Sequence, residues 1–324
     1  MKKSVVLYKK IPDDQRDKLS EHFNVTYFDG ITEQNRNDVE KALAEADGLI
    51  GASMPIRQDL LNYAPKLKAI STISVGVDQF DIDELNKRNI RLMHTPSVLT
   101  DTTADTIFTL VLATARRAVE LSMMVRAGKW HKSIGEEYYG VNVHHKTIGI
   151  LGMGRIGSAV AKRAFAGFDM QVLYVNEFAN KDVEQKYQAK KCELDDLLKQ
   201  SDFVVITLPL TKETEKLINK QKLSLMKPSA ILINGARGKI VDQAALTEAL
   251  QNKTIRAAGL DVFKVEPLPI DSPLMTLDNV VLTPHIGSAT YDTRYDMVVT
   301  AVDNIIMALK DEKPAYNLFN VQVS

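Results

Sequence analysis

The sequence is poor in cysteine, tryptophan and long apolar runs, and its charges balance. Its 324 residues include one cysteine, Cys192, so no disulfide framework can form within the chain. That usage fits a reducing compartment, and we expect the protein in the cytoplasm. The 41 basic and 41 acidic residues give a formal net charge of zero. No global field would therefore draw the chain to nucleic acid or to an anionic membrane.

No apolar run approaches the ~18 residues that a membrane span requires. The run from Val5 to Tyr8 is cut short by two lysines, so it predicts a first strand rather than the core of a signal peptide. There are only six histidines. No two of them have a convincing metal-binding spacing such as H-x-x-x-H, so we expect no metal site.

One stretch, from Thr147 to Gly157, organises the chain. Apolar and β-branched residues up to Leu151 predict a buried strand, a G-x-G-x-x-G motif follows, and Ala-rich sequence at helical spacing comes next. In that context the motif predicts a bound dinucleotide whose pyrophosphate lies at the helix N-terminus. The alternative is a glycine turn that binds nothing. The expected cofactor contacts are Gly152, Gly154, Arg155, Ile156 and Gly157.

The pattern of the remaining chain predicts an α/β protein. The length is about twice that of a typical domain, which favours two domains. In the first third, short apolar runs alternate with amphipathic stretches, as in parallel βαβ units. From Thr147 to Thr283 at least six strands alternate with helices, as in a doubly wound sheet. A long helix is predicted from Thr100 or Asp101 to about Ala127, and a last amphipathic helix from Thr290 to Leu309.

Three further residues lie where a dinucleotide would need them. Glu177 lies twenty residues beyond Gly157, about where an acidic residue meets the adenosine ribose. Pro209 follows a buried strand at a position that could flank an adenine. Asp261 ends another strand and could orient the nicotinamide amide or its ribose. A solvated loop glutamate is the alternative for Glu177.

Three chemically distinctive residues follow successive strands: Arg237, Glu266 and His285. Reduction of a ketone by a nicotinamide needs a proton donor, and histidine suits that role near neutral pH. A carboxylate beside it would favour the imidazolium form. Arg237 could hold a carboxylate and polarise a carbonyl with its planar fork. The alternatives are a surface arginine, a solvated loop glutamate and a histidine that caps a turn.

The loop after the fourth predicted strand offers a second anion site. Val75 and Gly76 lie among small residues, where backbone N–H groups could point at a carboxylate. A plain strand-to-helix turn is the alternative.

Four ordered motifs, GMGRIG, NGARG, GLDVF followed by EP, and PHIGSAT, resemble those of the D-isomer-specific 2-hydroxyacid dehydrogenases. The resemblance covers nearly the whole chain. It implies that Arg237, Glu266 and His285 are catalytic, with His285 as acid and base. It also implies that Val75 and Gly76 offer backbone N–H groups to the substrate carboxylate, and that Arg237 and His285 contact the substrate as well.

The resemblance also implies two Rossmann-like domains. A discontinuous, flavodoxin-like substrate domain would comprise residues 1–98 and 289–324, with the last helix returning to the N-terminal sheet. A dinucleotide-binding domain would comprise residues 99–288. Members of the family are usually homodimers joined through the nucleotide domain, so a homodimer is expected.

The motifs STISVG, MHTPSVLT and TARR point to the members that reduce glyoxylate, hydroxypyruvate and 2-ketogluconate. The expected reaction is therefore NAD(P)H-dependent reduction of small 2-oxo acids. NADP-using members carry arginines after the second Rossmann strand, whereas this chain has Glu177 there and Val175 in place of the usual NAD-selecting aspartate. We expect a modest preference for NADH. A dinucleotide-sensing regulator on the same fold is the alternative, and a phosphorylated substrate is disfavoured because the first third has no basic cluster.

Overall fold

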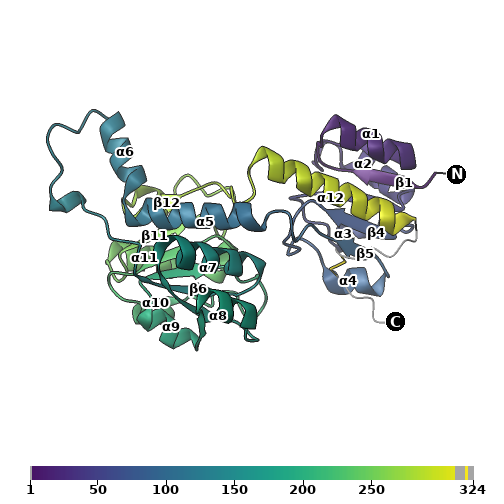
Figure 1. The fold of residues 1–324 in the computed structure, drawn as a ribbon. Coiled ribbons are helices and arrows are strands. Elements are labelled where there is room, and N and C mark those ends of the chain that lie inside the picture. The colour runs from purple at the N-terminus through teal and green to yellow at the C-terminus, as the bar shows by residue number, and fades with distance from the viewer. Residues whose placement is uncertain (1, 311–317, 320–324) are drawn as a thin grey trace. The chain divides into compact units, whose positions relative to one another are not determined.

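The structure, a computed structural model, describes residues 2–310 and 318–319. The chain divides into two compact units. The terminal unit combines Met1–Leu99 with Ala289–Ser324, and the central unit is Thr100–Ser288. Each unit is an α/β layer structure built on a parallel sheet (Figure 1). The predicted fold class is confirmed.

The terminal unit has a five-stranded sheet in the order β2-β1-β3-β4-β5 with all strands parallel. This is the flavodoxin-like order, with a switch in direction between β1 and β3. Its strands are β1 Ser4–Leu7, β2 Asn24–Tyr27, β3 Gly48–Gly51, β4 Ala69–Thr72 and β5 Arg91–Met93. Its helices are α1 Asp13–His22, α2 Arg36–Ala44, α3 Gln58–Leu61, α4 Ile82–Lys87 and α12 Tyr291–Leu309.

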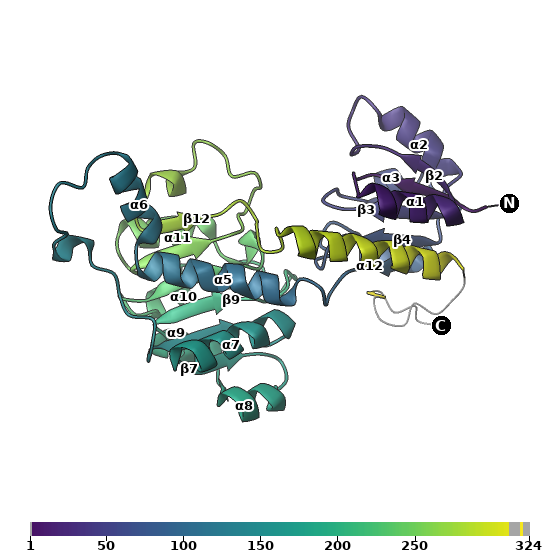
Figure 2. The same cartoon turned by 45° about the horizontal axis from the view of Figure 1, so that its top comes forward.

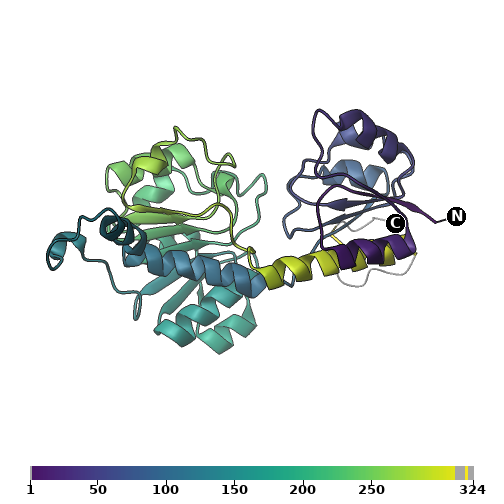
Figure 3. The same ribbon diagram turned by 90° about the horizontal axis from the view of Figure 1, so that it is seen from above.

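Helices cover both faces of this sheet (Figure 3). α1 and α12 pack side by side on one face, where α12 contacts β3, β4 and β5. Buried side chains of α2, α3 and α4 form the core on the other face. The return of the last helix to the N-terminal sheet, which the resemblance implied, is therefore present. Thr290 caps α12 by accepting a hydrogen bond from the backbone N–H of Thr293.

The central unit has a seven-stranded parallel sheet in the order β12-β11-β10-β9-β6-β7-β8. Counted from β6, this is the Rossmann order with one further strand. Its strands are β6 Thr147–Leu151, β7 Gln171–Val175, β8 Lys190–Lys191, β9 Phe203–Ile206, β10 Ile231–Asn234, β11 Ala257–Leu260 and β12 Val280–Leu282. Strands β9 and β10 are buried along their whole length, as strands covered on both faces must be.

Two hydrophobic cores lie on the two faces of this sheet. One contains side chains of α5 Thr100–Ala115, α7 Arg155–Phe168 and α8 Lys181–Tyr187. The other contains side chains of α9 Leu194–Gln200, α10 Lys220–Leu225 and α11 Gln243–Gln251. Three short 3-10 helices complete the unit: η1 Glu136–Tyr138, η2 Gly238–Ile240 and η3 Pro273–Thr276.

The prediction of one continuous helix from about Thr100 to Ala127 is wrong, because the structure has two helices there. α5 ends at Ala115, and a second helix, α6, runs from Ala118 to Arg126. Between them Arg117 has a left-handed backbone with φ 53°. The Arg117 guanidinium donates two hydrogen bonds to Glu120, of 2.8 and 2.6 Å, which hold this turn.

Among the described residues, no helix has both the length and the apolar character needed to cross a membrane.

Candidate active site

The turn between β6 and α7 has the shape that a pyrophosphate requires. Gly152 is buried with φ +98°, a conformation that favours glycine. A Cβ at Gly157 would lie 2.0 Å from the carbonyl oxygen of Gly152, so only glycine lets α7 pack this close. Gly154 is exposed, and nothing lies within 4 Å of the position of a Cβ there. The turn is therefore closed towards the protein and open outwards, which fits a bound dinucleotide.

Three polar side chains hold this turn in place. Asn176 Oδ1 accepts a hydrogen bond from Met153 N at 3.2 Å, and Asn180 Nδ2 donates to Met153 O at 3.0 Å. Thr207 Oγ1 donates to the carbonyl oxygen of Gly152 at 2.6 Å. The sequence interpretation missed all three roles, because they depend on how strands β7 and β9 flank β6.

The other predicted cofactor residues follow strands adjacent to β6. Glu177 follows β7 and is exposed, and its carbonyl oxygen accepts a hydrogen bond from Lys191 Nζ at 2.9 Å. Lys181 pairs with Glu184 at 2.8 Å. Pro209 follows β9 and is also exposed. Since β7, β6 and β9 are neighbours in a parallel sheet, Glu177, the glycine turn and Pro209 lie at its carboxyl edge, beside the switch between β6 and β9.

A histidine–carboxylate pair lies at the same edge of the sheet. His285 follows β12, and its Nδ1 lies 2.7 Å from Glu266 Oε2. The other carboxylate oxygen, Oε1, accepts a hydrogen bond from Phe263 N at 2.9 Å. Burial opposes ionisation of Glu266, but these hydrogen bonds and the positive charges of His285 and Arg237 hold the pKa of this carboxyl below its usual value.

This pairing fixes the orientation of the imidazole. Because Glu266 is ionised, it accepts hydrogen bonds only, so Nδ1 of His285 carries a proton and donates it to Oε2. Within the part of the chain that the structure describes, no hydrogen bond occupies Nε2 of His285. The side chain is about half exposed. Nε2 is therefore available to a ligand.

Arg237 lies in the loop after β10, and a second glycine brings this loop to the histidine–carboxylate pair. A Cβ at Gly238 would lie 1.9 Å from the carbonyl carbon of Phe263, so the two loops touch through their backbones. The buried Asn234 ties the Arg237 loop together, because its side chain accepts from Ala236 N at 3.1 Å and donates to Arg237 O at 3.0 Å. Sequence interpretation had not assigned a role to Asn234.

Asp261 holds the loop that carries His285. It is 1% exposed, and its two carboxylate oxygens accept three hydrogen bonds. The donors are Thr283 Oγ1 at 2.6 Å, Ile286 N at 2.8 Å and Gly287 N at 2.9 Å. These donors flank His285 on both sides, so Asp261 holds the loop that carries His285.

The predicted anion loop of the terminal unit follows β4. Val75 and Gly76 are half-buried, and Ser74 Oγ donates a hydrogen bond to Gly76 O at 2.8 Å. The loop therefore has a fixed backbone at the carboxyl edge of its own sheet, which is where such sheets bind ligands.

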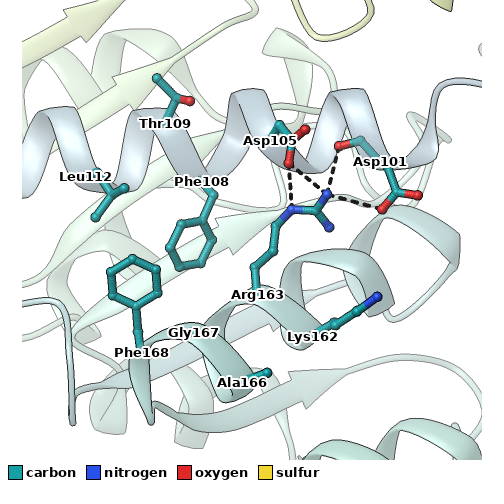
Figure 4. Close-up of a pocket in the computed structure, with 10 residues that line it drawn as sticks. All are labelled: Asp101, Asp105, Phe108, Thr109, Leu112, Lys162, Arg163, Ala166, Gly167 and Phe168. Atoms are coloured by element: carbon teal, nitrogen blue, oxygen red, sulfur yellow. Dashed lines mark hydrogen bonds and ion pairs between the residues drawn. The ribbon is translucent and has the colours of Figure 1, made fainter.

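A groove of about 680 Å³ lies elsewhere in the central unit, between α5 and α7 (Figure 4). Arg163 of α7 reaches across it to Asp105 at 2.7 Å and Asp101 at 3.1 Å. At its other end the rings of Phe108 and Phe168 pack 4.9 Å apart. It lies on the helical layer rather than at the carboxyl edge of the sheet, and it holds none of the predicted site residues. Among the described residues, no group of three His, Cys, Asp or Glu side chains could hold a metal ion.

Comparison with known proteins identifies the family. Residues 108–287 match the model of the D-isomer specific 2-hydroxyacid dehydrogenase NAD-binding domain. The chain belongs to the D-isomer-specific 2-hydroxyacid dehydrogenases. A glyoxylate/hydroxypyruvate reductase B of Serratia proteamaculans is 59% identical over 309 residues, which is 95% of each chain. The predicted family is confirmed.

Solved structures of other dehydrogenases have the same fold. An NADPH-dependent glyoxylate/hydroxypyruvate reductase of Sinorhizobium meliloti, solved with NADP and malonate, is 28% identical with a TM-score of 0.86 and covers 99% of this chain and 98% of its own. A D-lactate dehydrogenase of Aquifex aeolicus, solved with NAD and lactic acid, is 28% identical with a TM-score of 0.88. The match covers 98% of this chain and 99% of the Aquifex chain. These comparisons give no support to the dinucleotide-sensing alternative.

Proposed function

We propose that this 2-hydroxyacid dehydrogenase reduces small 2-oxo acids with NADH or NADPH. Glyoxylate and hydroxypyruvate are the first substrates to test, because relatives that are 59% and 57% identical to this chain are named glyoxylate/hydroxypyruvate reductases. 2-Ketogluconate is a third substrate to test. The observation that carries the proposal is the 2.7 Å contact between His285 and Glu266 at the sheet edge that also holds the glycine turn.

The residues of the central unit suit this reaction. The nicotinamide, when bound, supplies the hydride to the carbonyl carbon. His285 then donates a proton from Nε2 to the oxygen of the new alkoxide, while Glu266 stabilises the imidazolium and fixes its orientation. Arg237 binds the carboxylate and carbonyl of the oxo acid through its planar fork.

The two units take different parts in this proposal. The central unit, residues 99–288 in the boundaries expected from sequence, binds the dinucleotide. The terminal unit, residues 1–98 and 289–324, binds the substrate through the backbone N–H groups of Val75 and Gly76, which hold its carboxylate.

A substitution at the acid tests the proposal. His285→Ala removes the proton donor, so kcat for glyoxylate reduction should fall by about 10²–10⁴-fold. The Kd for NADH, measured by quenching of Trp130 fluorescence or by calorimetry, should stay within about twofold because His285 is a donor to substrate rather than to cofactor. His22→Ala, on α1, is the matched control. Reduction at the wild-type rate by His285→Ala would exclude His285 as the acid.

The cofactor preference follows from the charges near the ribose position. Asn176 and Asn180 are engaged with Met153, and Lys181 with Glu184, so none of them is free to hold a 2′-phosphate without losing a contact. Glu177 would repel that phosphate and accept hydrogen bonds from free ribose hydroxyls. The positive charge of Lys191, whose Nζ lies 2.9 Å from the carbonyl oxygen of Glu177, would instead attract the 2′-phosphate. We therefore propose a modest preference for NADH, with measurable use of NADPH.

We also propose that the protein is a cytoplasmic homodimer. None of the residues of α6 is buried, and α6 with the following loop stands off the sheet of the central unit (Figures 1 and 2). Five large apolar side chains are exposed on this segment: Val119, Met123, Val125, Trp130 and Ile134. A monomer seldom exposes such a cluster, and a second copy of the chain would cover it. The single cysteine supports the reducing cytoplasm as its location.

A further inference from the structure

The loop that carries Val75 and Gly76 is built on a network of side chains within the terminal unit. Thr72 Oγ1 lies 2.7 Å from Ser74 Oγ, and Ser74 Oγ donates onwards to Gly76 O at 2.8 Å. Gln79 Nε2 donates to both hydroxyl oxygens at 3.3 Å. These bonds hold the carbonyl of Gly76. The carbonyl of Val75 is held separately, by a residue that follows strand β5.

That second support is His94, at the end of β5. Its Nδ1 lies 3.0 Å from the carbonyl oxygen of Val75. A carbonyl oxygen only accepts, so Nδ1 carries the hydrogen in this bond. The backbone around His94 is held in turn, because Thr95 N donates to Ser74 O at 2.9 Å and Asn304 of α12, itself 1% exposed, donates to His94 O at 3.1 Å.

The position of this hydrogen bond matters because of peptide geometry. The carbonyl of Val75 and the N–H of Gly76 belong to one planar, trans peptide group and point in opposite directions. A donor that fixes the Val75 oxygen therefore also fixes the direction of the Gly76 N–H. Polarisation of the peptide by that bond makes the N–H a better donor as well.

The imidazole has a further neighbour near the C-terminal end of the chain. Leu318 pairs with Met93 in an antiparallel bridge, and Phe319 N donates to Leu92 O at 2.8 Å. Residues 318–319 thus extend the sheet at its β5 edge. This pairing places the ring of Phe319 edge-on to that of His94, with the ring centres 5.3 Å apart at 79°. Such edge-to-face contacts restrict how a ring can turn.

We propose that His94 is a positioning residue for binding of the substrate carboxylate, and that Phe319 holds His94 in place. His94 orients the Gly76 N–H through the Val75 carbonyl, and the edge contact with Phe319 keeps the imidazole in the donating orientation. Docking of residues 318–319 on β5 is thereby coupled to substrate affinity. The inference rests on the proposed function, in which Val75 and Gly76 bind the carboxylate.

Substitutions at His94 test the first step. His94→Phe keeps an aromatic ring for Phe319 but removes the donor, so the KM for glyoxylate should rise about 5–10-fold, the effect of one lost hydrogen bond. The kcat and the KM for the dinucleotide should change by less than about twofold, because both depend on the central unit. His94→Asn places an amide N–H near the position of Nδ1 and should restore the wild-type KM.

Substitution of Phe319 tests the second step. Phe319→Ala keeps the backbone bond to Leu92 and should raise the KM for glyoxylate about 2–4-fold, less than loss of the donor itself. In the His94→Phe background it should add almost nothing, because the bond that it supports is already absent. Tyr27→Ala is the matched control. Tyr27 is similarly exposed, 38% against 41% for Phe319, but lies on β2 at the opposite edge of the sheet.

The outcomes separate this inference from the proposed function. If the wild type reduces glyoxylate and His94→Phe leaves the KM for glyoxylate unchanged, this inference is overturned but the proposed function is not. If His94→Phe lowers kcat and the melting temperature and raises the KM for the dinucleotide as much as the KM for glyoxylate, His94 only supports the fold. That result would also overturn the inference. Failure of the wild type to reduce any 2-oxo acid with either cofactor would overturn the proposed function and this inference with it.

Discussion

At the scale of the residue, the candidate catalytic groups could be predicted because they follow strands. Arg237, Glu266 and His285 each lie beyond a short apolar run, and the carboxyl ends of parallel strands share one edge. The supporting roles of other residues could not be predicted in this way, including that of Asp261, which the sequence had singled out only for a contact with the nicotinamide. Asn234 and Asp261 bind backbone groups whose positions depend on how neighbouring loops pack, and local sequence carries no signal for such contacts.

The histidine–carboxylate pair makes a testable prediction about pH. Because the pKa of Glu266 is held below its usual value, Glu266 is a fixed negative charge throughout the range in which a histidine titrates. Glu266→Gln removes that charge and makes the imidazolium less favourable, so the proton donor is lost at lower pH. The alkaline limb of the kcat–pH profile for reduction should therefore move to lower pH. A limb that stays in place would show that Glu266 does not tune the donor.

At the scale of the element, sequence patterning identified most strands and helices but not the break in the first long helix. The sequence around Arg117 contains neither glycine nor proline, the usual signals of a helix end. The break is held instead by the bonds of Arg117 to Glu120 and by the Tyr138 ring, whose centre lies 5.6 Å from the guanidinium. The two-residue strand β8 was missed because it is too short to show a period.

Two glycines of the β6–α7 turn should respond differently to the same substitution. Gly157→Ala forces a methyl group against the carbonyl oxygen of Gly152 and should lower the free energy of unfolding by about 1–3 kcal/mol. Gly154→Ala meets no protein atom, so the melting temperature should hold while the Kd for NADH rises, because the added methyl blocks the approach of the pyrophosphate. Thermal melts and calorimetry check both. Equal effects of the two substitutions would contradict this account of the turn.

At the scale of the whole molecule, the sequence motifs identified the family and both sheets, whereas the exposed apolar segment on α6 could not be recognised without the structure. Apolar residues of a helix normally predict a buried face, and here apolar residues of α6 are exposed, Met123 at 65%. The pattern alone cannot tell whether an apolar face packs within the chain or against a second copy.

The proposed dimer can be tested by sedimentation. The wild type should sediment at twice the chain mass of 36.1 kDa. The double variant Met123→Glu with Trp130→Ser places charge and polarity on the exposed segment and should shift the protein towards monomer, by weakening association about tenfold or more. Ile270→Glu, at a residue that is 93% exposed elsewhere in the central unit, should leave the mass unchanged. A monomeric wild type would exclude the dimer.

The central claim is that the chain turns over 2-oxo acids with a nicotinamide cofactor, and steady-state kinetics test it most directly. Oxidation of NADH and of NADPH by the wild-type protein should be measured with glyoxylate, hydroxypyruvate and 2-ketogluconate. We predict turnover of glyoxylate and hydroxypyruvate with both cofactors, and a kcat/KM that modestly favours NADH. Strong selection of NADPH would show that Glu177 does not face the ribose. Binding of either dinucleotide without its oxidation, whichever oxo acid is present, would contradict the claim itself.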